Sequence, residues 1–290
     1  MHAPLSEPRV TITARGVNRI LSGHPWVYRS DIRAADGVEP GDTVRVMDER
    51  GRFVGKAWYS SASQIALRLL TREDVALDDA WLAARIEAAD ELRRRVVEHT
   101  TAYRLVYGES DGLPGLIVDR YANYLVLQTL TQASERRKET FARLLQERFA
   151  PAGIIERNDP KVRRLEGLEQ KVGVLAGECP PEVVAEENGV RFAYDLLGGQ
   201  KTGAFLDQRE NRAAAARYAQ GEVLDCFCYA GGFALTVAPR AAQVEAVENA
   251  PMALAAARRN VQLNGATNIS LRQANVFDVL KSYSDAGRQF

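Results

Sequence analysis

Two acidic residues and a pair of glycines stand where a strand–turn–helix unit would bind a nucleoside. Asp225 ends an apolar run, and Gly231 and Gly232 follow before an Ala/Leu/Val-rich helix expected from about Phe233. Such a unit brings backbone N–H groups and a helix N-terminus close to a ligand. Glu248 ends the next apolar run, where a carboxylate can accept hydrogen bonds from ribose hydroxyls. The pattern therefore predicts a site for a nucleoside cofactor.

The same residues also have purely structural interpretations. Asp225 could cap the turn that follows it, the two glycines could be an ordinary start of a helix, and Glu248 could be a solvated acid at a strand end. Asn249 is expected to cap the next helix rather than to contact a ligand. The turn lacks G-x-G-x-x-G spacing, which disfavours a third interpretation, a dinucleotide dehydrogenase.

Alternating strand and helix patterns surround these residues from about residue 191 onward. Strands are expected at 192–197, 223–227, 244–248 and 269–274, and helices at 205–219, from about 233, and at 251–264. Pro251 at the start of the last helix and Gly265 just after it are typical helix boundaries. The alternation predicts a parallel, doubly wound sheet.

The first 190 residues have a different organisation. Residues 9–70 contain short β-branched or aromatic runs between turn signals and predict a small all-β barrel. The middle part combines helices at 78–99 and 134–149, a hairpin turning at Ala122-Asn123, and strands at 153–159 and 171–177. The predicted fold is therefore multidomain, α/β and α+β, with domains at 1–70, 71–190 and 191–290.

Composition narrows the functional class. No apolar run approaches the roughly 18 residues of a membrane helix, and the N-terminus lacks a signal-peptide pattern. The three cysteines, Cys179, Cys226 and Cys228, lack other metal ligands nearby in sequence, so we expect no metal site and a reducing cytoplasm. The net charge is zero, but residues 1–70 hold ten basic and seven acidic side chains, which is compatible with an RNA-binding surface there.

Four segments resemble one known family in order and spacing. They are GHPWVYRSDI at 23–32, ESDGLPGLIVDRY at 109–121, GGQKTGAFLDQRENR at 198–212 and VLDCFCYAGGF at 223–233. The family is the S-adenosylmethionine-dependent large-subunit ribosomal RNA cytosine-5 methyltransferases with an N-terminal PUA domain. The resemblance runs from about residue 9 to 290, and GQKTGAFLDQR is its most specific part. It implies an RNA-binding PUA barrel, a central α+β domain and a Rossmann-like class I methyltransferase domain.

The resemblance also implies S-adenosylmethionine as cofactor, large-subunit ribosomal RNA as partner, and a homodimer as one possible assembly. The expected cofactor residues are Lys201, Thr202, Gly203, Phe205, Asp225, Phe227, Tyr229, Gly231, Gly232, Glu248, Asn275 and Phe277. Asn275 could bond the adenine edge and Phe277 could stack on it, although core packing would explain the phenylalanine equally well. Arg209 and Arg212 could face RNA phosphate or the cofactor, or lie on a solvated or salt-bridged surface.

An RNA surface is expected on the N-terminal domain. Its candidate residues are Arg15, Arg19, His24, Trp26, Arg29 and Arg33. Basic side chains interleaved with aromatic rings suit phosphate contact and base stacking. Trp26 could instead belong to the core of the barrel.

The family's chemistry is covalent. A thiolate adds to carbon 6 of cytosine, carbon 5 then attacks the sulfonium methyl group, and a base removes the carbon 5 proton. Family members continue beyond the position of Phe290 with the loops that carry the nucleophile, so the methyltransferase domain is expected to be incomplete here. We therefore expect no catalytic residue within the chain, and Cys179, Cys226 and Cys228 to be small apolar filler.

The leading prediction is thus a ribosomal RNA methyltransferase family member that lacks its catalytic C-terminal loops and does not itself methylate cytosine. The alternative is a non-catalytic RNA-binding protein that retains a cofactor-binding half-domain.

Overall fold

A computed structural model describes residues 7–290 of the 290-residue chain, and these residues form two compact units. The first unit comprises the described residues up to Val96 together with Arg104–Cys179. The second comprises Val97–Tyr103 together with Pro180–Phe290. The predicted boundaries at 70/71 and 190/191 stay predictions, and residues 1–6 of the first predicted domain lie outside the described part.

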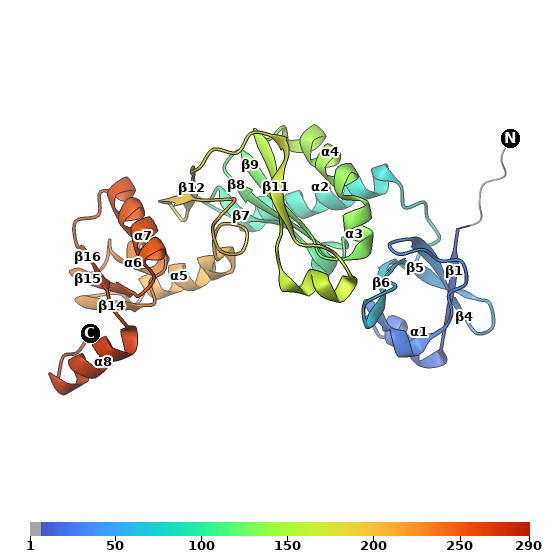
Figure 1. Cartoon of the computed structure of the whole chain (residues 1–290), viewed down its shortest axis with the longest axis horizontal. Helices are drawn as coiled ribbons and strands as arrows, with labels where there is room; N and C mark the ends of the chain where they lie inside the picture. The colour runs from blue at the N-terminus through green and yellow to red at the C-terminus, as the bar shows by residue number, and fades with distance from the viewer. Residues whose placement is uncertain (1–6) are drawn as a thin grey trace. The chain divides into compact units, whose positions relative to one another are not determined.

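Six strands form the N-terminal sheet of the first unit, in the order β2-β6-β5-β4-β1-β3 (Figure 1). They are β1 (Arg9–Ile12), β2 (Trp26–Tyr28), β3 (Ile32–Ala34), β4 (Thr43–Asp48), β5 (Phe53–Tyr59) and β6 (Ile65–Thr71). Alternate residues of β4, Val44 and Val46, lie in the same apolar core as Val10 of β1. This two-residue period is what the sequence pattern predicted.

The prediction that residues 9–70 contain only strands is wrong at α1 (Ala14–Leu21). Thr13 caps this helix, because its Oγ1 accepts a hydrogen bond from the backbone N–H of Gly16 at 3.2 Å. Ile20 is buried in the core of the sheet. Glycine has a low helix propensity, so Gly16 disfavours a helix in a prediction from sequence. In the structure this glycine packs closely, since a Cβ there would lie 3.2 Å from the Cβ of Asp31.

A five-stranded sheet forms the rest of the first unit, in the order β11-β10-β9-β8-β7. Its strands are β7 (Ala102–Tyr107), β8 (Leu116–Tyr121), β9 (Tyr124–Thr129), β10 (Gly153–Asn158) and β11 (Lys171–Gly177). The predicted hairpin is confirmed, since Tyr121 pairs with Tyr124 across Ala122-Asn123. Strands β9 and β10 are parallel, and the helices between them make this an α+β arrangement.

The helices of this sheet are α2 (Asp79–Val96), α3 (Gln132–Arg136) and α4 (Lys138–Phe149), and α2 contacts α4 (Figure 1). The single helix predicted at 134–149 is wrong, because the chain breaks at Arg137. The Arg137 guanidinium donates to the carbonyl of Gly41 at 2.8 Å and to Oγ1 of Thr43 at 2.7 Å. A tertiary contact thus overrides a helical sequence pattern.

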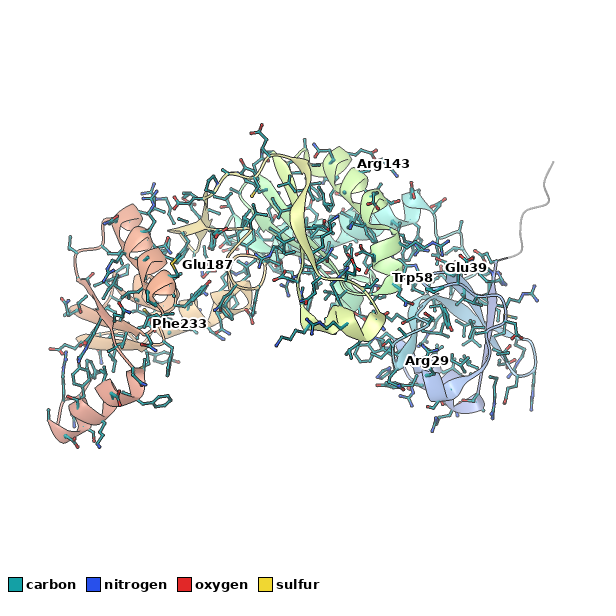
Figure 2. The ribbon with its side chains drawn as sticks, viewed as in Figure 1. Arg29, Glu39, Trp58, Arg143, Glu187 and Phe233 are labelled. Carbon is teal, nitrogen blue, oxygen red and sulfur yellow. The ribbon has the colours of Figure 1, made fainter. Side chains whose placement is uncertain are left out.

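The two sheets of the first unit are joined by buried contacts. Trp58 of β5, which Figure 2 labels, lies edge-on to Phe141 of α4, with ring centroids 6.4 Å apart. Oγ of Ser60 donates to Oε2 of the buried Glu166 at 2.7 Å. These contacts explain why both sheets belong to one compact unit.

The second unit contains the predicted parallel sheet, in the order β14-β15-β16, but the strand expected at 192–197 is not part of it. Its strands are β14 (Glu222–Cys226), β15 (Gln243–Glu248) and β16 (Ile269–Gln273), and β12 (Val183–Glu187) and β13 (Val190–Tyr194) form a separate antiparallel pair. Its helices are α5 (Arg209–Ala216), α6 (Gly232–Val237), α7 (Pro251–Asn264) and α8 (Val276–Asp285). Helix α5 is shorter than the helix predicted at 205–219, because residues 206–208 form a 3-10 turn.

Helices cover both faces of this parallel sheet. Val244 and Ala246 of β15 lie in one apolar cluster with residues of α6, and Val247 lies in another with Val276 and Val279 of α8. The boundaries of α7 agree with the prediction, since Pro251 begins it and Gly265 (φ +61°) follows it. Within residues 7–290, no helix has both the length and the apolar character needed to cross a membrane.

Candidate cofactor site and RNA-binding surface

The turn after β14 has an unusual backbone. Phe227, Tyr229 and Gly231 have φ values of +61°, +49° and +82°, the left-handed region that non-glycine residues rarely adopt. The backbone N–H of Cys228 donates to the carbonyl of Val247 at 3.0 Å and holds the turn against β15. Conformations of this kind cost free energy and persist mainly where surrounding structure fixes them, often at ligand sites.

Glu248, at the end of β15, is bonded to this turn. Its Oε2 accepts from the backbone N–H of Tyr229 at 3.0 Å, and its Oε1 accepts from the N–H groups of Asn249 and Ala250 at 2.8 and 2.9 Å. The carboxylate therefore fixes the turn and the start of α7 together. The expectation that Asn249 caps α7 is wrong, because Ala250 occupies the N-cap position.

The predicted segment Lys201–Phe205 reaches the same turn. The ring of Phe205 lies edge-on to Tyr229, with centroids 5.5 Å apart, and Nζ of Lys201 lies 4.3 Å from the Phe205 ring centroid. Lys201 also pairs with Asp207 at 2.9 Å, while Thr202 and Gly203 are buried. The structure thus brings this loop and the turn together.

Two exposed phenylalanines meet at the other end of the turn. The rings of Phe227 and Phe277 are 5.7 Å apart, and they are 56% and 70% exposed. Phe277 is therefore not a core residue, which removes the packing interpretation. Asn275 caps α8, because its Oδ1 accepts from the N–H of Phe277 at 2.9 Å.

A cavity of about 500 Å³ lies beside the turn. Among the predicted cofactor residues, Gly203, Phe205, Tyr229 and Gly232 line it. Asp225 instead lines a different cavity, of about 990 Å³, along β14. Its Oδ2 accepts from the N–H of Ala234 in α6 at 2.9 Å. This bond agrees with the structural interpretation of Asp225 as a capping residue.

Charges around the turn are buried. Burial raises the pKa of Asp225 to about 6, against the opposing effects of the Ala234 N–H and the Arg212 guanidinium. Arg212 itself pairs with the buried Glu187 at 2.5 Å and donates to the carbonyl of Phe205 at 3.1 Å (Figure 2 labels Glu187). A Cβ on Gly232 would lie 2.6 Å from Nε of Arg212, so the Arg212 side chain would have to shift if this residue were not a glycine.

Arg209 and Arg212 therefore have different environments. Arg209 pairs with its exposed neighbour Glu210 at 2.7 Å, which agrees with its interpretation as a salt-bridged residue. Arg212 faces the cofactor turn. Sequence reasoning missed Glu187, the buried partner of Arg212, because it lies in an acidic stretch with no motif around it.

Asn260 is a second residue that sequence reasoning missed. It is 1% exposed within α7, its Nδ2 donates to the carbonyl of Ala230 at 2.9 Å, and its Oδ1 accepts from the N–H of Ala193 at 2.8 Å. The signal was present in the sequence, since Asn260 continues the buried face of Ala253 and Ala257 at helical spacing. A polar residue on an apolar face predicts a specific buried partner.

Cys226 and Cys228 pack as apolar residues on either side of the sheet. Burial, with a smaller effect of Asp225, raises the pKa of both thiols, that of Cys228 to about 12. The raised pKa disfavours the thiolate form, which agrees with their interpretation as filler. Cys179 is half-buried.

Most of the predicted RNA-binding arginines lie close to acidic side chains. Arg15 pairs with the buried Asp31 at 2.5 Å, Arg19 lies 3.6 Å from the same carboxylate, and Arg33 pairs with Glu49 at 2.8 Å. Arg15 and Arg33 keep 64% and 61% of their side chains exposed, so both can still reach phosphate.

Arg29 differs from the other three (Figure 2). Its guanidinium donates to the backbone carbonyls of Ser60 and Ser63, which gives it a structural role. Removing this side chain would leave two carbonyls of the same loop without their donor.

The aromatic residues of this segment form a partly exposed cluster. His24 and Trp26 are edge-on with centroids 5.7 Å apart, and the Arg19 guanidinium lies 4.6 Å from the Tyr28 ring centroid. Nε1 of Trp26 donates to Oε1 of Glu109 at 2.9 Å. Trp26 is outside the apolar core cluster of the sheet, and it links β2 to the central domain.

Two family models match the chain. The model of a PUA-like domain matches residues 10–72, and that of an S-adenosylmethionine-dependent methyltransferase matches residues 163–287. Among the described residues, no cluster of three or more His, Cys, Asp or Glu side chains could hold a metal ion.

The chain is similar to several proteins named ribosomal RNA large subunit methyltransferase I. It is 41% identical to that of Shewanella denitrificans over 277 residues, covering 92% of this chain and 70% of the relative. It is 42% identical to that of Vibrio cholerae over 278 residues, with the same coverage, and 39% identical to that of Pseudoalteromonas atlantica over 290 residues, covering 97% and 73%.

Two solved structures share the fold. One is a candidate SAM-dependent methyltransferase from Streptococcus mutans, with a TM-score of 0.79, 20% identity, and coverage of 97% of this chain and 74% of that one. The other is a candidate methyltransferase in complex with SAH, with a TM-score of 0.80, 20% identity, and coverage of 97% and 73%.

Proposed function

Because the chain belongs to the ribosomal RNA large subunit methyltransferase I family, we propose that it binds S-adenosylmethionine at the 227–232 turn for methylation of cytosine carbon 5 in large-subunit ribosomal RNA. The observation that carries this proposal is the left-handed backbone of Phe227, Tyr229 and Gly231. A strained turn bonded to Glu248 is what a ligand-binding backbone needs.

The residues around the turn fit the cofactor. Glu248 already orients both carboxylate oxygens at the turn and keeps lone pairs for ribose hydroxyls. The exposed rings of Phe227 and Phe277 suit stacking on adenine, and Asn275 lies beside them. Asp225 would hold the methionine ammonium of the cofactor, directly or through water. When bound, S-adenosylmethionine supplies a methyl group activated by a sulfonium.

The N-terminal sheet would bind the RNA. Arg15 and Arg33 are exposed cations. His24 and Trp26 belong to a partly exposed aromatic cluster, and Arg19 lies against the Tyr28 ring of the same cluster. Phosphate contact by such cations gives an affinity that falls with salt. The homodimer and the cytoplasmic location stay predictions.

The test is transfer of tritium from methyl-labelled S-adenosylmethionine to unmodified large-subunit ribosomal RNA, followed by identification of the labelled nucleoside. Label in 5-methylcytidine supports the whole proposal. Label in another nucleoside contradicts the cytosine carbon 5 target, and absence of both cofactor binding and RNA binding contradicts the proposal entirely.

A second candidate function is binding of RNA and cofactor without methyl transfer. In the same experiment this function predicts binding of both ligands and no transferred label from the 290-residue chain.

A further inference from the structure

Tyr107 is an exposed aromatic residue at the end of β7, an edge strand of the central sheet. Its side chain is 53% exposed. The guanidinium carbon of Arg104 lies 5.1 Å from the centroid of its ring. This distance is within the range of a cation–π contact.

Arg104 is held by a buried acid. Its Nε and Nη2 donate to the two carboxylate oxygens of Asp119 at 2.9 and 3.0 Å, and Asp119 is 0% exposed. Burial alone would lower the pKa of Arg104, but the ion pair outweighs it and the pKa is raised, so the cation persists. A bidentate ion pair of this kind also fixes the plane of the guanidinium.

The backbone of Tyr107 is held as well. Its N–H donates to Oδ2 of Asp111 at 2.6 Å, and Nη2 of Arg93 donates to the same oxygen at 2.7 Å. Nε of Arg93 also donates to the carbonyl of Arg104 at 3.1 Å. Arg93 and Asp111 are both almost buried, so the segment from 104 to 111 is fixed before any ligand binds.

The tyrosine lies next to the predicted RNA surface. Glu109, two residues further along, accepts the hydrogen bond from Nε1 of Trp26 at 2.9 Å. Nε of Arg68 lies 3.6 Å from the same carboxylate oxygen of Glu109. The segment ESDGLPG, which takes no part in the cofactor site, therefore joins the N-terminal sheet to the strand that ends in Tyr107.

We propose that Tyr107, backed by Arg104, is a stacking platform for an unpaired base of the RNA substrate. Single-stranded RNA is recognised largely by aromatic and guanidinium planes, and every base offers a face to stack on. Both planes are present here: Asp119 fixes the Arg104 guanidinium, Asp111 fixes the backbone of Tyr107, and the tyrosine side chain is 53% exposed. The inference rests on the proposed RNA substrate and adds a contact in the central domain.

The test compares the affinities of Tyr107→Ala, Tyr107→Phe and wild-type chains for an unmodified large-subunit ribosomal RNA transcript. Tyr107→Ala should weaken binding by about 5- to 150-fold, which is the about 1–3 kcal/mol of one stacked base. Tyr107→Phe should bind like wild type, since a phenyl ring stacks equally well. Tyr218→Ala, which removes a tyrosine that is 84% exposed in the second unit, is the matched control.

Two further readouts separate stacking from other roles. The salt dependence of binding should have the same slope in Tyr107→Ala as in wild type, because stacking releases no counterions. Ultraviolet crosslinking to a transcript containing 5-iodouridine should label the peptide that contains Tyr107.

Unchanged RNA affinity in Tyr107→Ala would overturn the inference, as would a loss of affinity shared by Tyr107→Phe. A change in self-association with unchanged RNA affinity would also overturn it and would assign the ring to a protein contact. Failure of the wild-type chain to bind the transcript at all would instead remove the proposed function, which keeps the two failures distinguishable.

Discussion

Glu248 and Tyr229 are joined across the edge of the parallel sheet, where Oε2 of the carboxylate accepts the backbone N–H of the turn at 3.0 Å. This bond links the end of β15 to the turn after β14, which are the two places where such folds contact a nucleoside. The acid therefore has two roles in the proposed site. It fixes a strained turn, and it offers its remaining lone pairs to a ribose.

The buried pair of Arg212 and Glu187 should matter for stability. Glu187→Ala would leave the Arg212 guanidinium buried without its partner and should lower the free energy of unfolding by about 3–5 kcal/mol. Arg259→Ala breaks an exposed pair with Glu182 and should cost no more than about 1 kcal/mol. Urea denaturation of both variants checks this, and equal effects would contradict it.

The two glycines of the turn should respond to substitution for different reasons. Gly232→Ala would place a Cβ 2.6 Å from Nε of Arg212, and Gly231→Ala would strain a residue at φ +82°. Both should weaken S-adenosylmethionine binding in calorimetry. Gly265→Ala is the control, because it strains φ +61° after α7 with nothing within 4 Å of the new Cβ, and cofactor affinity should stay unchanged.

Sequence reasoning recovered the parts of the fold that depend on local pattern. The strand at Val244–Val247, the α7 boundaries and the turn at Ala122-Asn123 follow from periodicity and turn chemistry, which act over a few residues. The break at Arg137 could not be predicted, because its cause lies at Gly41 and Thr43, far away in the sequence.

The candidate site likewise combines residues that local sequence patterns predict with residues that depend on tertiary contacts. The turn and Glu248 were identified from strand ends and glycines, and the exposed positions of Phe227 and Phe277 fit the predicted adenine contact. The sequence does not decide between a surface and a cofactor position for Arg212, because its partner Glu187 carries no sequence signal. Buried ion pairs depend on tertiary neighbours, so a single sequence reveals them poorly.

Asp225 should give the chain a recognisable pH dependence. Its pKa is raised in the folded chain from 3.8 to about 6 by burial, so the folded state holds the proton more tightly. Its contribution to stability is therefore present below about pH 4 and is lost as the pH rises through about 6. Asp225→Asn should gain stability relative to wild type over that window, as measured by urea denaturation at several pH values. A difference that is constant with pH would contradict the raised pKa.

Arg33 and Arg29 should affect RNA binding differently. Arg33→Ala removes an exposed cation and should lower the slope of log affinity against log salt by about one unit, with little change in stability. Arg29→Ala should lower the unfolding midpoint, since it removes the donor to Ser60 and Ser63. Arg240→Ala, at an exposed position of the second unit, is the control for charge alone. An equal fall in slope for Arg33→Ala and Arg240→Ala would contradict a specific surface.

The most direct test of the cofactor site is calorimetry of S-adenosylmethionine binding to the 290-residue chain and to Glu248→Ala. We expect S-adenosylmethionine to bind the wild-type chain and the dissociation constant to rise about 10- to 150-fold in the variant, because a hydrogen bond to a charged group contributes about 1.5–3 kcal/mol. Glu222→Ala, which removes an exposed acid at the opposite end of β14, should bind like wild type. Equal affinity in Glu248→Ala and wild type, or binding of NAD in place of S-adenosylmethionine, would contradict the account.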